Sequence, residues 1–137
     1  MEPMRFVVGT RDCDELGHLN VSGYVYYCNR AGMALIEAMG WPPGQANRGR
    51  RYSFAAVHMV SDYLAELHEG EEIAVHVGIS LIGTKSATFD NTITRADGAV
   101  VFRSAWKSAL MDLDSRRAVT IPDDLRAAMQ PHLTGAG

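Results

Sequence analysis

The stretch Arg11–Tyr27, RDCDELGHLNVSGYVYY, places an acidic turn directly before a segment with helical periodicity. Three carboxylates crowd this turn: those of Asp12, Asp14 and Glu15. The N-terminus of a helix carries partial positive charge and free N–H groups, so it attracts carboxylates and binds anions or oxyanions. The turn is therefore either a solvated helix start or a carboxylate held beside donors that can polarise a carbonyl group.

A helix is predicted from about Ser22 to Met39, because apolar residues follow one another there at steps of three or four. The residues of this apolar face are Val21, Val25, Cys28, Gly32, Leu35 and Met39. The residues expected on the other side are Tyr24, Asn29, Arg30 and Glu37. Asn20 or Ser22 can cap the first turn, and Gly40 ends the helix.

Strands are expected on both sides of this helix. The segments that favour strands are Arg5–Thr10, Tyr52–Leu67, Ile73–Leu81, Ala87–Ile93 and Ala99–Met111. Asp97-Gly98 is typical of a tight hairpin turn, and a short helix is expected at about 122–130. This order predicts an α+β fold in one domain, 1–137, with an antiparallel five-stranded sheet wrapped around one long central helix.

The composition excludes several classes of protein. The net charge of −3 and the pI of about 5.9 provide no general attraction for nucleic acid or an anionic membrane surface. No apolar run is long enough to span a bilayer, and no secretion signal is recognisable. The two cysteines do not make a disulfide framework. We therefore expect a reduced, cytoplasmic protein.

The segment Arg11–Tyr27 resembles the D-x-D-x-x-G-H-x-N-x-x-x-Y-x-x-Y signature of hotdog-fold acyl-CoA thioesterases, including the 4-hydroxybenzoyl-CoA thioesterase-like group. The order of elements is similar as well, and the resemblance covers about Met4 to Leu113. It implies hydrolysis of an acyl-CoA thioester to a free acid and coenzyme A. It also implies a homodimer or homotetramer with sites at a subunit interface, and no cofactor other than the coenzyme A of the substrate.

The same resemblance implies roles for the residues of the turn. Asp14 matches the catalytic aspartate, which acts as a nucleophile or as a general base toward water. Gly17 matches the glycine that lets the backbone pass close to the thioester. Val21 lies where the family has a backbone N–H that polarises the thioester carbonyl. His18 and Asn20 match residues that shape the turn and line the pocket.

Further substrate-binding positions are expected beyond the turn. Tyr24 matches an aromatic position of the family, whereas Asn29 replaces a glutamate that many members carry. His58 and Asp62 fall on one face of a strand, where they either line the pocket or bond each other. The aromatic residues that could build a pocket are Tyr24, Tyr27, Phe54, Tyr63 and Trp106.

The phosphates of coenzyme A require cations, and Arg51, Lys85 and Arg103 are the candidates. The five histidines are scattered without metal-ligand spacing, so no metal site is expected. No Gly-rich phosphate loop is present for a redox dinucleotide or ATP. Cys28 is expected to be a buried thiol, and the acidic neighbours of Cys13 are expected to blunt its reactivity.

Two alternatives to an acyl-CoA thioesterase stay open at this point. One is a thioesterase that acts on acyl-carrier protein through the same pantetheine arm. The other is a non-catalytic acyl-CoA binding module, which the neutral side chain of Asn29 favours. The sequence does not identify the acyl group.

Overall fold

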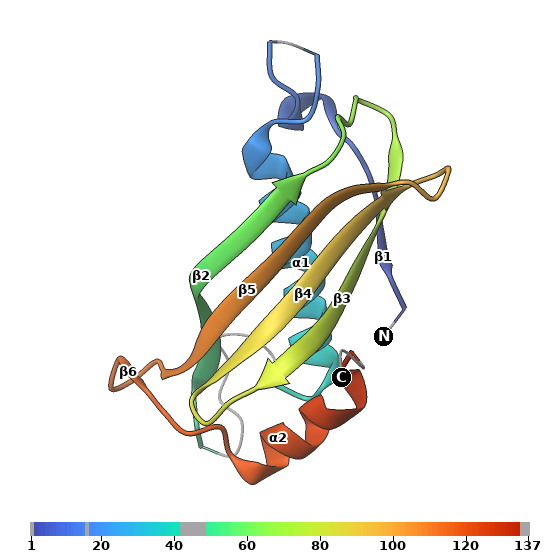
Figure 1. Ribbon diagram of the computed structural model, residues 1–137. Coiled ribbons are helices and arrows are strands. Elements are labelled where there is room, and N and C mark those ends of the chain that lie inside the picture. The colour runs from blue at the N-terminus through green and yellow to red at the C-terminus, as the bar shows by residue number, and fades with distance from the viewer. Residues whose placement is uncertain (1, 16, 42–48, 135–137) are drawn as a thin grey trace.

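The computed structural model describes residues 2–15, 17–41 and 49–134, in which one antiparallel sheet packs against one helix (Figure 1). The strands are β1 (Met4–Val7), β2 (Tyr52–Tyr63), β3 (Glu72–Ile82), β4 (Ser86–Arg95), β5 (Val100–Asp112) and β6 (Arg117–Ala118). The helical segments are η1 (Thr10–Asp12), α1 (Val21–Ala38), α2 (Asp123–Met129) and η2 (Gln130–His132). Helix α1 thus lies between the first two strands in sequence, as predicted.

The strands lie side by side in the order β1-β3-β4-β5-β2, and β6 pairs with the end of β5. The Asp97-Gly98 turn joins β4 to β5 as predicted. The amide of Gly98 donates to the carbonyl of Arg95 over 2.9 Å, and Gly98 has a φ of +86°, which glycine adopts without steric strain. Strands β1 and β2 form the two edges of the main sheet.

Helix α1 packs its apolar side on the sheet, and that side matches the predicted one only in part. The buried residues of α1 are Gly23, Tyr24, Tyr27, Cys28, Ala31 and Leu35. Cys28 and Leu35 were predicted correctly, whereas Val21 is 60% exposed. The buried side is shifted because the two tyrosine rings pack inward while their hydroxyl groups reach polar partners, a combination that apolar spacing alone does not reveal.

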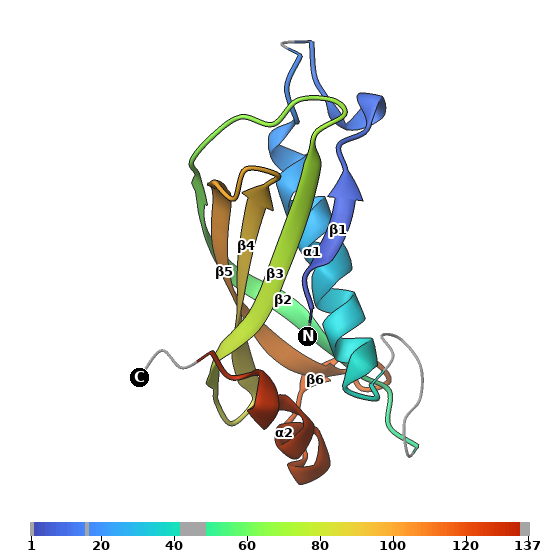
Figure 2. The same ribbon diagram turned by 90° about the vertical axis from the view of Figure 1, so that its right-hand side faces the viewer.

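The α+β class and the antiparallel sheet are confirmed, but three details of the predicted fold need correction. The sheet has six strands rather than five, because the chain turns back after β5 and adds β6. Helix α1 has only 18 residues and lies along one face of the sheet, so it is not a long helix enclosed by the sheet (Figure 2). Its outer side stays exposed at Tyr26 and Met33.

Two predicted strands end early. The first ends at Val7 and is followed by the 3-10 turn η1, and the second ends at Tyr63 instead of Leu67. The predicted terminal helix is confirmed as α2, which covers one end of the sheet (Figure 1). Neither helix of the described chain is both long and apolar enough to cross a membrane.

The apolar core consists of two clusters along α1. The first surrounds Tyr24, Tyr27 and Phe102 near the start of the helix. The second surrounds Leu35 near its end and includes residues of α2 such as Leu125. The start of α1 is therefore fixed on a packed support, and this start carries the acidic turn.

Candidate active site

The acidic turn closes on itself between Asp14 and His18. The amide of Asp14 donates to the carbonyl of His18 over 3.0 Å, and the amide of Gly17 donates to the carbonyl of Asp14 over 3.0 Å. Cys13 and Leu19 form an antiparallel bridge across the base of the turn. Gly17 has a φ of +83°, a left-handed conformation that strains other residues. Gly17 is therefore required here for backbone shape.

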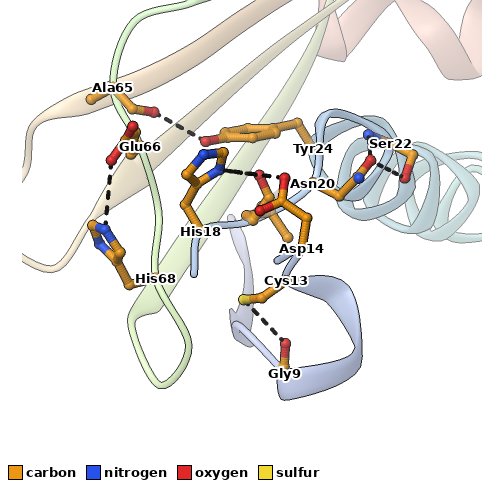
Figure 3. Close-up of polar contacts among 11 residues, drawn as sticks. Gly9, Cys13, Asp14, His18, Asn20, Ser22, Tyr24, Ala65, Glu66 and His68 are labelled. Atoms are coloured by element: carbon orange, nitrogen blue, oxygen red, sulfur yellow. Dashed lines mark hydrogen bonds and ion pairs between the residues drawn. The ribbon is translucent and has the colours of Figure 1, made fainter. Parts of the chain in front are cut away.

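The side chains of Asp14 and His18 point toward one another (Figure 3). Nδ1 of His18 lies 3.8 Å from Oδ2 of Asp14, and the two side chains are 25% and 28% exposed. The same Nδ1 lies 3.3 Å from the carbonyl oxygen of Leu19. The carboxylate is therefore held at the protein surface with a histidine beside it, where it is open to a substrate.

The start of α1 leaves one backbone donor available beside this turn. Oδ1 of Asn20 accepts bonds from the amide and the hydroxyl of Ser22, over 3.0 and 2.9 Å (Figure 3). The amide of Gly23 donates to the carbonyl of Asn20 over 2.8 Å. The amide of Val21 forms no hydrogen bond to any described residue. Because it belongs to a helix N-terminus, this N–H can donate to a ligand oxygen.

Asp12 ties the turn to the helix. The hydroxyl of Tyr27 donates to Oδ2 of Asp12 over 2.8 Å, and the amide of Asn20 donates to the carbonyl of Asp12 over 2.9 Å. Burial, and then the bond to Asp12, raise the pKa of Tyr27 to about 12. The phenol therefore stays a donor at neutral pH. The sequence identified Asp12 only as one of three carboxylates in the acidic turn, and a D-x-D turn followed by a helical tyrosine is the signal for its bond to Tyr27.

The connection from β2 to β3 holds the other side of the turn. The amide of Leu19 donates to the carbonyl of Leu67 over 2.6 Å, and His18 forms an isolated antiparallel bridge with His68. The hydroxyl of Tyr24 donates to the carbonyl of Ala65 over 3.1 Å (Figure 3). Contacts of this kind, between segments about fifty residues apart, could not be predicted from the sequence.

A cavity of about 330 Å³ opens beside the turn. Its lining includes Glu66 and four of the predicted residues: His18, Val21, Tyr24 and Tyr63. Rings of Tyr24 and Tyr63 meet edge to face with centroids 5.2 Å apart. The structure thus brings together a carboxylate, a histidine, a helix N–H and aromatic walls.

Asn29 lies farther along α1 and away from the turn. Its Nδ2 donates to Sδ of Met33 over 3.6 Å, and both residues line a second cavity between α1 and the sheet. Phe54 and Trp106, two of the aromatic residues considered for a pocket, line this second cavity as well. The predicted aromatic set is therefore divided between two cavities, with Tyr27 in neither lining.

Four other predicted residues do not line the cavity beside the turn: His58, Arg103, Arg51 and Lys85. His58 and Arg103 pair with Lys107 and Asp62 in the register of β2 and β5, and alternation places all four on the sheet face opposite α1. Arg51 is paired with Asp114, its Nη1 lying 2.7 Å from Oδ1. The roles of His58 and Arg103 in binding stay predictions.

Arg51 and Lys85 lie near the end of the sheet opposite the acidic turn. Lys85 belongs to the turn between β3 and β4, and Arg51 directly precedes β2 (Figure 1). The side chain of Lys85 is exposed. Their roles toward coenzyme A likewise stay predictions.

Neither cysteine has the environment of a nucleophile. Cys28 is fully buried, and this burial raises the pKa of its thiol to about 12. Burial, followed by the charges of Glu69 and Asp12, raises the pKa of Cys13. The burial of Cys28 confirms the prediction for that residue. Low-pKa thiols are the reactive ones, so the raised pKa of Cys13 agrees with the blunted reactivity expected for it, which stays a prediction. Among the described residues, no group of three His, Cys, Asp or Glu is placed to hold a metal ion.

Sheet, helix and turn together define the class, a hotdog-fold protein with a polar turn at the start of its main helix. Residues 8–129 match the model of the thioesterase-like superfamily. The chain belongs to this superfamily, which confirms the predicted family and its class, a thioester hydrolase.

Solved structures share the fold at low sequence identity. A predicted thioesterase from Bacillus stearothermophilus is 24% identical with a TM-score of 0.85, covering 99% of this chain and 98% of its own. A 1,4-dihydroxy-2-naphthoyl-CoA thioesterase from Synechocystis is 17% identical with a TM-score of 0.80, and the match covers 94% of this chain and 95% of that protein. A hypothetical protein from Staphylococcus aureus, solved in complex with CoA, is 15% identical with a TM-score of 0.81, covering 98% and 87%.

Proposed function

We propose that this protein hydrolyses an acyl-CoA thioester to a free acid and coenzyme A, with Asp14 as the reacting carboxylate. The observation that carries this proposal is the juxtaposition of the Asp14 turn with the available N–H of Val21 at the start of α1. Membership of the thioesterase-like superfamily supports it. The solved structures named for a CoA thioesterase or for a complex with CoA support coenzyme A as the carrier.

Hydrolysis requires an attacking oxygen and a donor for the charge that develops on the thioester oxygen. Asp14 supplies the attack in one of two ways. It bonds to the thioester carbon, expels the thiolate of coenzyme A and leaves a mixed anhydride for water to open, or it takes a proton from a water that attacks directly. The N–H of Val21 donates to the oxyanion in both cases. His18 positions the carboxylate of Asp14 from 3.8 Å away.

We further propose a homodimer, formed through edge strand β2. This strand and the residue after it expose several large apolar side chains: Val57, Met59, Val60, Tyr63 and Leu64. Exposed apolar residues on an edge strand indicate a surface that pairs with another chain. Tyr63 and Leu64 also line the cavity beside the turn, so a second subunit on β2 would border the site.

The free thiols of Cys13 and Cys28 suit a reducing cytoplasm.

The test is a panel of acyl-CoA thioesters, with the release of free thiol measured for the wild type and for Asp14→Ala. We expect release by the wild type and at least about a hundredfold less by the variant. Binding of acyl-CoA by the wild type without any release contradicts the proposal and indicates a binding module, which Asn29 would favour. Release from acyl-carrier protein but not from coenzyme A moves the substrate to the carrier protein.

A further inference from the structure

The second cavity lies between the middle of α1 and the sheet, and has a volume of about 310 Å³. Cys28, Gly32 and Met33 of α1 form one wall, and Phe54, Phe89 and Trp106 of the sheet form another. The cavity lies between the two clusters of the core, because Trp106 belongs to the first cluster and Phe89 to the second. Its volume is at the lower end of the range for small-molecule sites, which is about 300–1,000 Å³.

One polar side chain in this lining is buried without satisfying its hydrogen bonds. Asn91 of β4 is only 3% exposed, and alternation along the strand puts its side chain on the same face as Phe89 and Ile93. Among residues 2–15, 17–41 and 49–134, Nδ2 of Asn91 has no hydrogen-bond partner. A buried donor without a partner destabilises the folded protein, so such a group calls for an explanation, such as a functional role or a bound water or ion.

Gly32 keeps the helix wall of this cavity open. A Cβ atom built on Gly32 meets no heavy atom of the described residues within 4 Å. A glycine in the middle of a helix is less favourable than alanine, so the sequence gives up helix stability at a position where a side chain would fit. The combination is an apolar, unfilled space with one unused donor on its wall.

We propose that this cavity binds the acyl group of the substrate, and that Nδ2 of Asn91 donates to a hydroxyl or keto oxygen carried by that acyl group. The inference rests on the proposed function and names its substrate class, oxygen-substituted acyl groups of medium size. Asn29, at the rim of the cavity, follows Val21 by about 12 Å of helix. The hydroxyl or keto oxygen that Asn91 binds is therefore remote from the thioester carbonyl, which lies at the start of α1.

The first test compares medium-chain acyl-CoA thioesters with their keto-substituted counterparts of the same length, with the keto group at successive positions. For the best position we expect kcat/KM of the wild type to favour the keto substrate by about fivefold or more, the effect of one buried hydrogen bond. In Asn91→Leu, whose side chain is of similar size, we expect this preference to vanish while the unsubstituted substrate is still hydrolysed. A preference that survives in Asn91→Leu overturns the inference, as does equal use of both substrates by the wild type.

The second test measures binding without catalysis, by calorimetry with the free keto acids. We expect binding by the wild type and at least fivefold weaker binding by Asn91→Leu and by Gly32→Leu, whose side chain fills the cavity. Thermal unfolding of each variant checks the fold. Binding of the acid by a protein that hydrolyses no thioester would contradict the proposed function and leave the cavity assignment in place. Hydrolysis of the thioester, together with unchanged binding of the keto acid in both variants, would leave the proposed function in place and overturn the cavity assignment.

Discussion

The hydroxyl of Tyr27 donates a 2.8 Å hydrogen bond to Oδ2 of Asp12, which joins the second turn of α1 to the loop that carries Asp14. Asp12 is two residues before Asp14, and its carbonyl also accepts from the amide of Asn20. The position of Asp14 relative to the start of α1 therefore depends on a contact made by neither Asp14 nor Val21. We regard Tyr27 and Asp12 as positioning residues.

We predict that Tyr27→Phe lowers the free energy of unfolding by about 2 kcal/mol, because the bond it removes has a charged acceptor. We also expect kcat for thioester hydrolysis to fall more than KM changes, since the variant alters the placement of Asp14. Denaturant unfolding and steady-state kinetics measure the two effects. Tyr26→Phe is the matched control, because Tyr26 is exposed and its hydroxyl accepts from Nη1 of Arg30 on the same helix. Equal effects of the two substitutions would contradict this role of Tyr27.

Asn20 is the cap of α1, and its loss should affect stability and activity together. We predict that Asn20→Ala lowers the free energy of unfolding by about 1 kcal/mol, as expected for a missing N-cap side chain. Asn20→Asp retains the acceptor for the amide of Ser22 and should restore most of that stability. Chemical denaturation of the two variants gives the comparison. An Asn20→Ala variant as stable as the wild type would show that this cap is dispensable.

Two glycines of α1 should respond in opposite ways to alanine. A Cβ on Gly23 would overlap Cδ1 of Leu19, whereas a Cβ on Gly32 meets no atom of the described part of the chain within 4 Å. We predict that Gly23→Ala destabilises the protein by about 1–3 kcal/mol through overpacking. Gly32→Ala should stabilise it by up to about 1 kcal/mol through helix propensity. The melting temperatures of the two variants test these predictions. A Gly23→Ala variant more stable than the wild type would contradict the first and show that Leu19 moves aside easily.

Stability should fall as the pH rises above about 9. The pKa values of Cys28 and Tyr27 are both raised to about 12 in the folded protein, from ordinary values of 9.0 and 10.0. Both groups are neutral when protonated, so the unfolded chain loses these protons first. The stabilisation is complete below pH 9 and is lost as the pH rises toward 12, at up to about 1.4 kcal/mol per pH unit for each group.

Denaturant unfolding at pH 8, 9 and 10 measures this loss. Cys28→Ala should be less stable than the wild type at pH 8, because a buried side chain is shortened. It should also lose less stability between pH 9 and pH 10, where the thiol accounts for most of the change. An identical pH dependence in the variant and the wild type would contradict a raised pKa of Cys28.

The sequence was sufficient for the turn and for most elements, because their signals are local. The spacing from Asp12 to Tyr27 and the Asp97-Gly98 turn predicted the family and a hairpin that the comparisons and the structure confirm. The side of α1 that is buried was predicted only in part, since Tyr24 and Tyr27 are amphipathic and their burial depends on distant acceptors.

The remaining features depend on contacts between distant segments. Strand β6 has two residues and exists only because β5 lies beside it, so no periodicity could reveal it. Asn91 lies in a segment correctly predicted as a strand, but its unsatisfied amide becomes visible only when α1 and β5 surround it. Residues such as Arg51 and Lys85 look equivalent to any surface cation in sequence, and the structure places them at the end of the sheet opposite the turn.

The measurement that tests the central claim most directly is thiol release from acyl-CoA by Asp14→Asn beside Glu15→Gln. Both substitutions remove one negative charge from the same turn, and Glu15 is exposed. We predict that Asp14→Asn loses at least about a hundredfold in kcat, because the amide neither attacks the thioester nor accepts a proton from water. Glu15→Gln should stay within a few fold of the wild type, with equal melting temperatures for both variants. Wild-type turnover by Asp14→Asn would contradict the assignment of Asp14 as the reacting group.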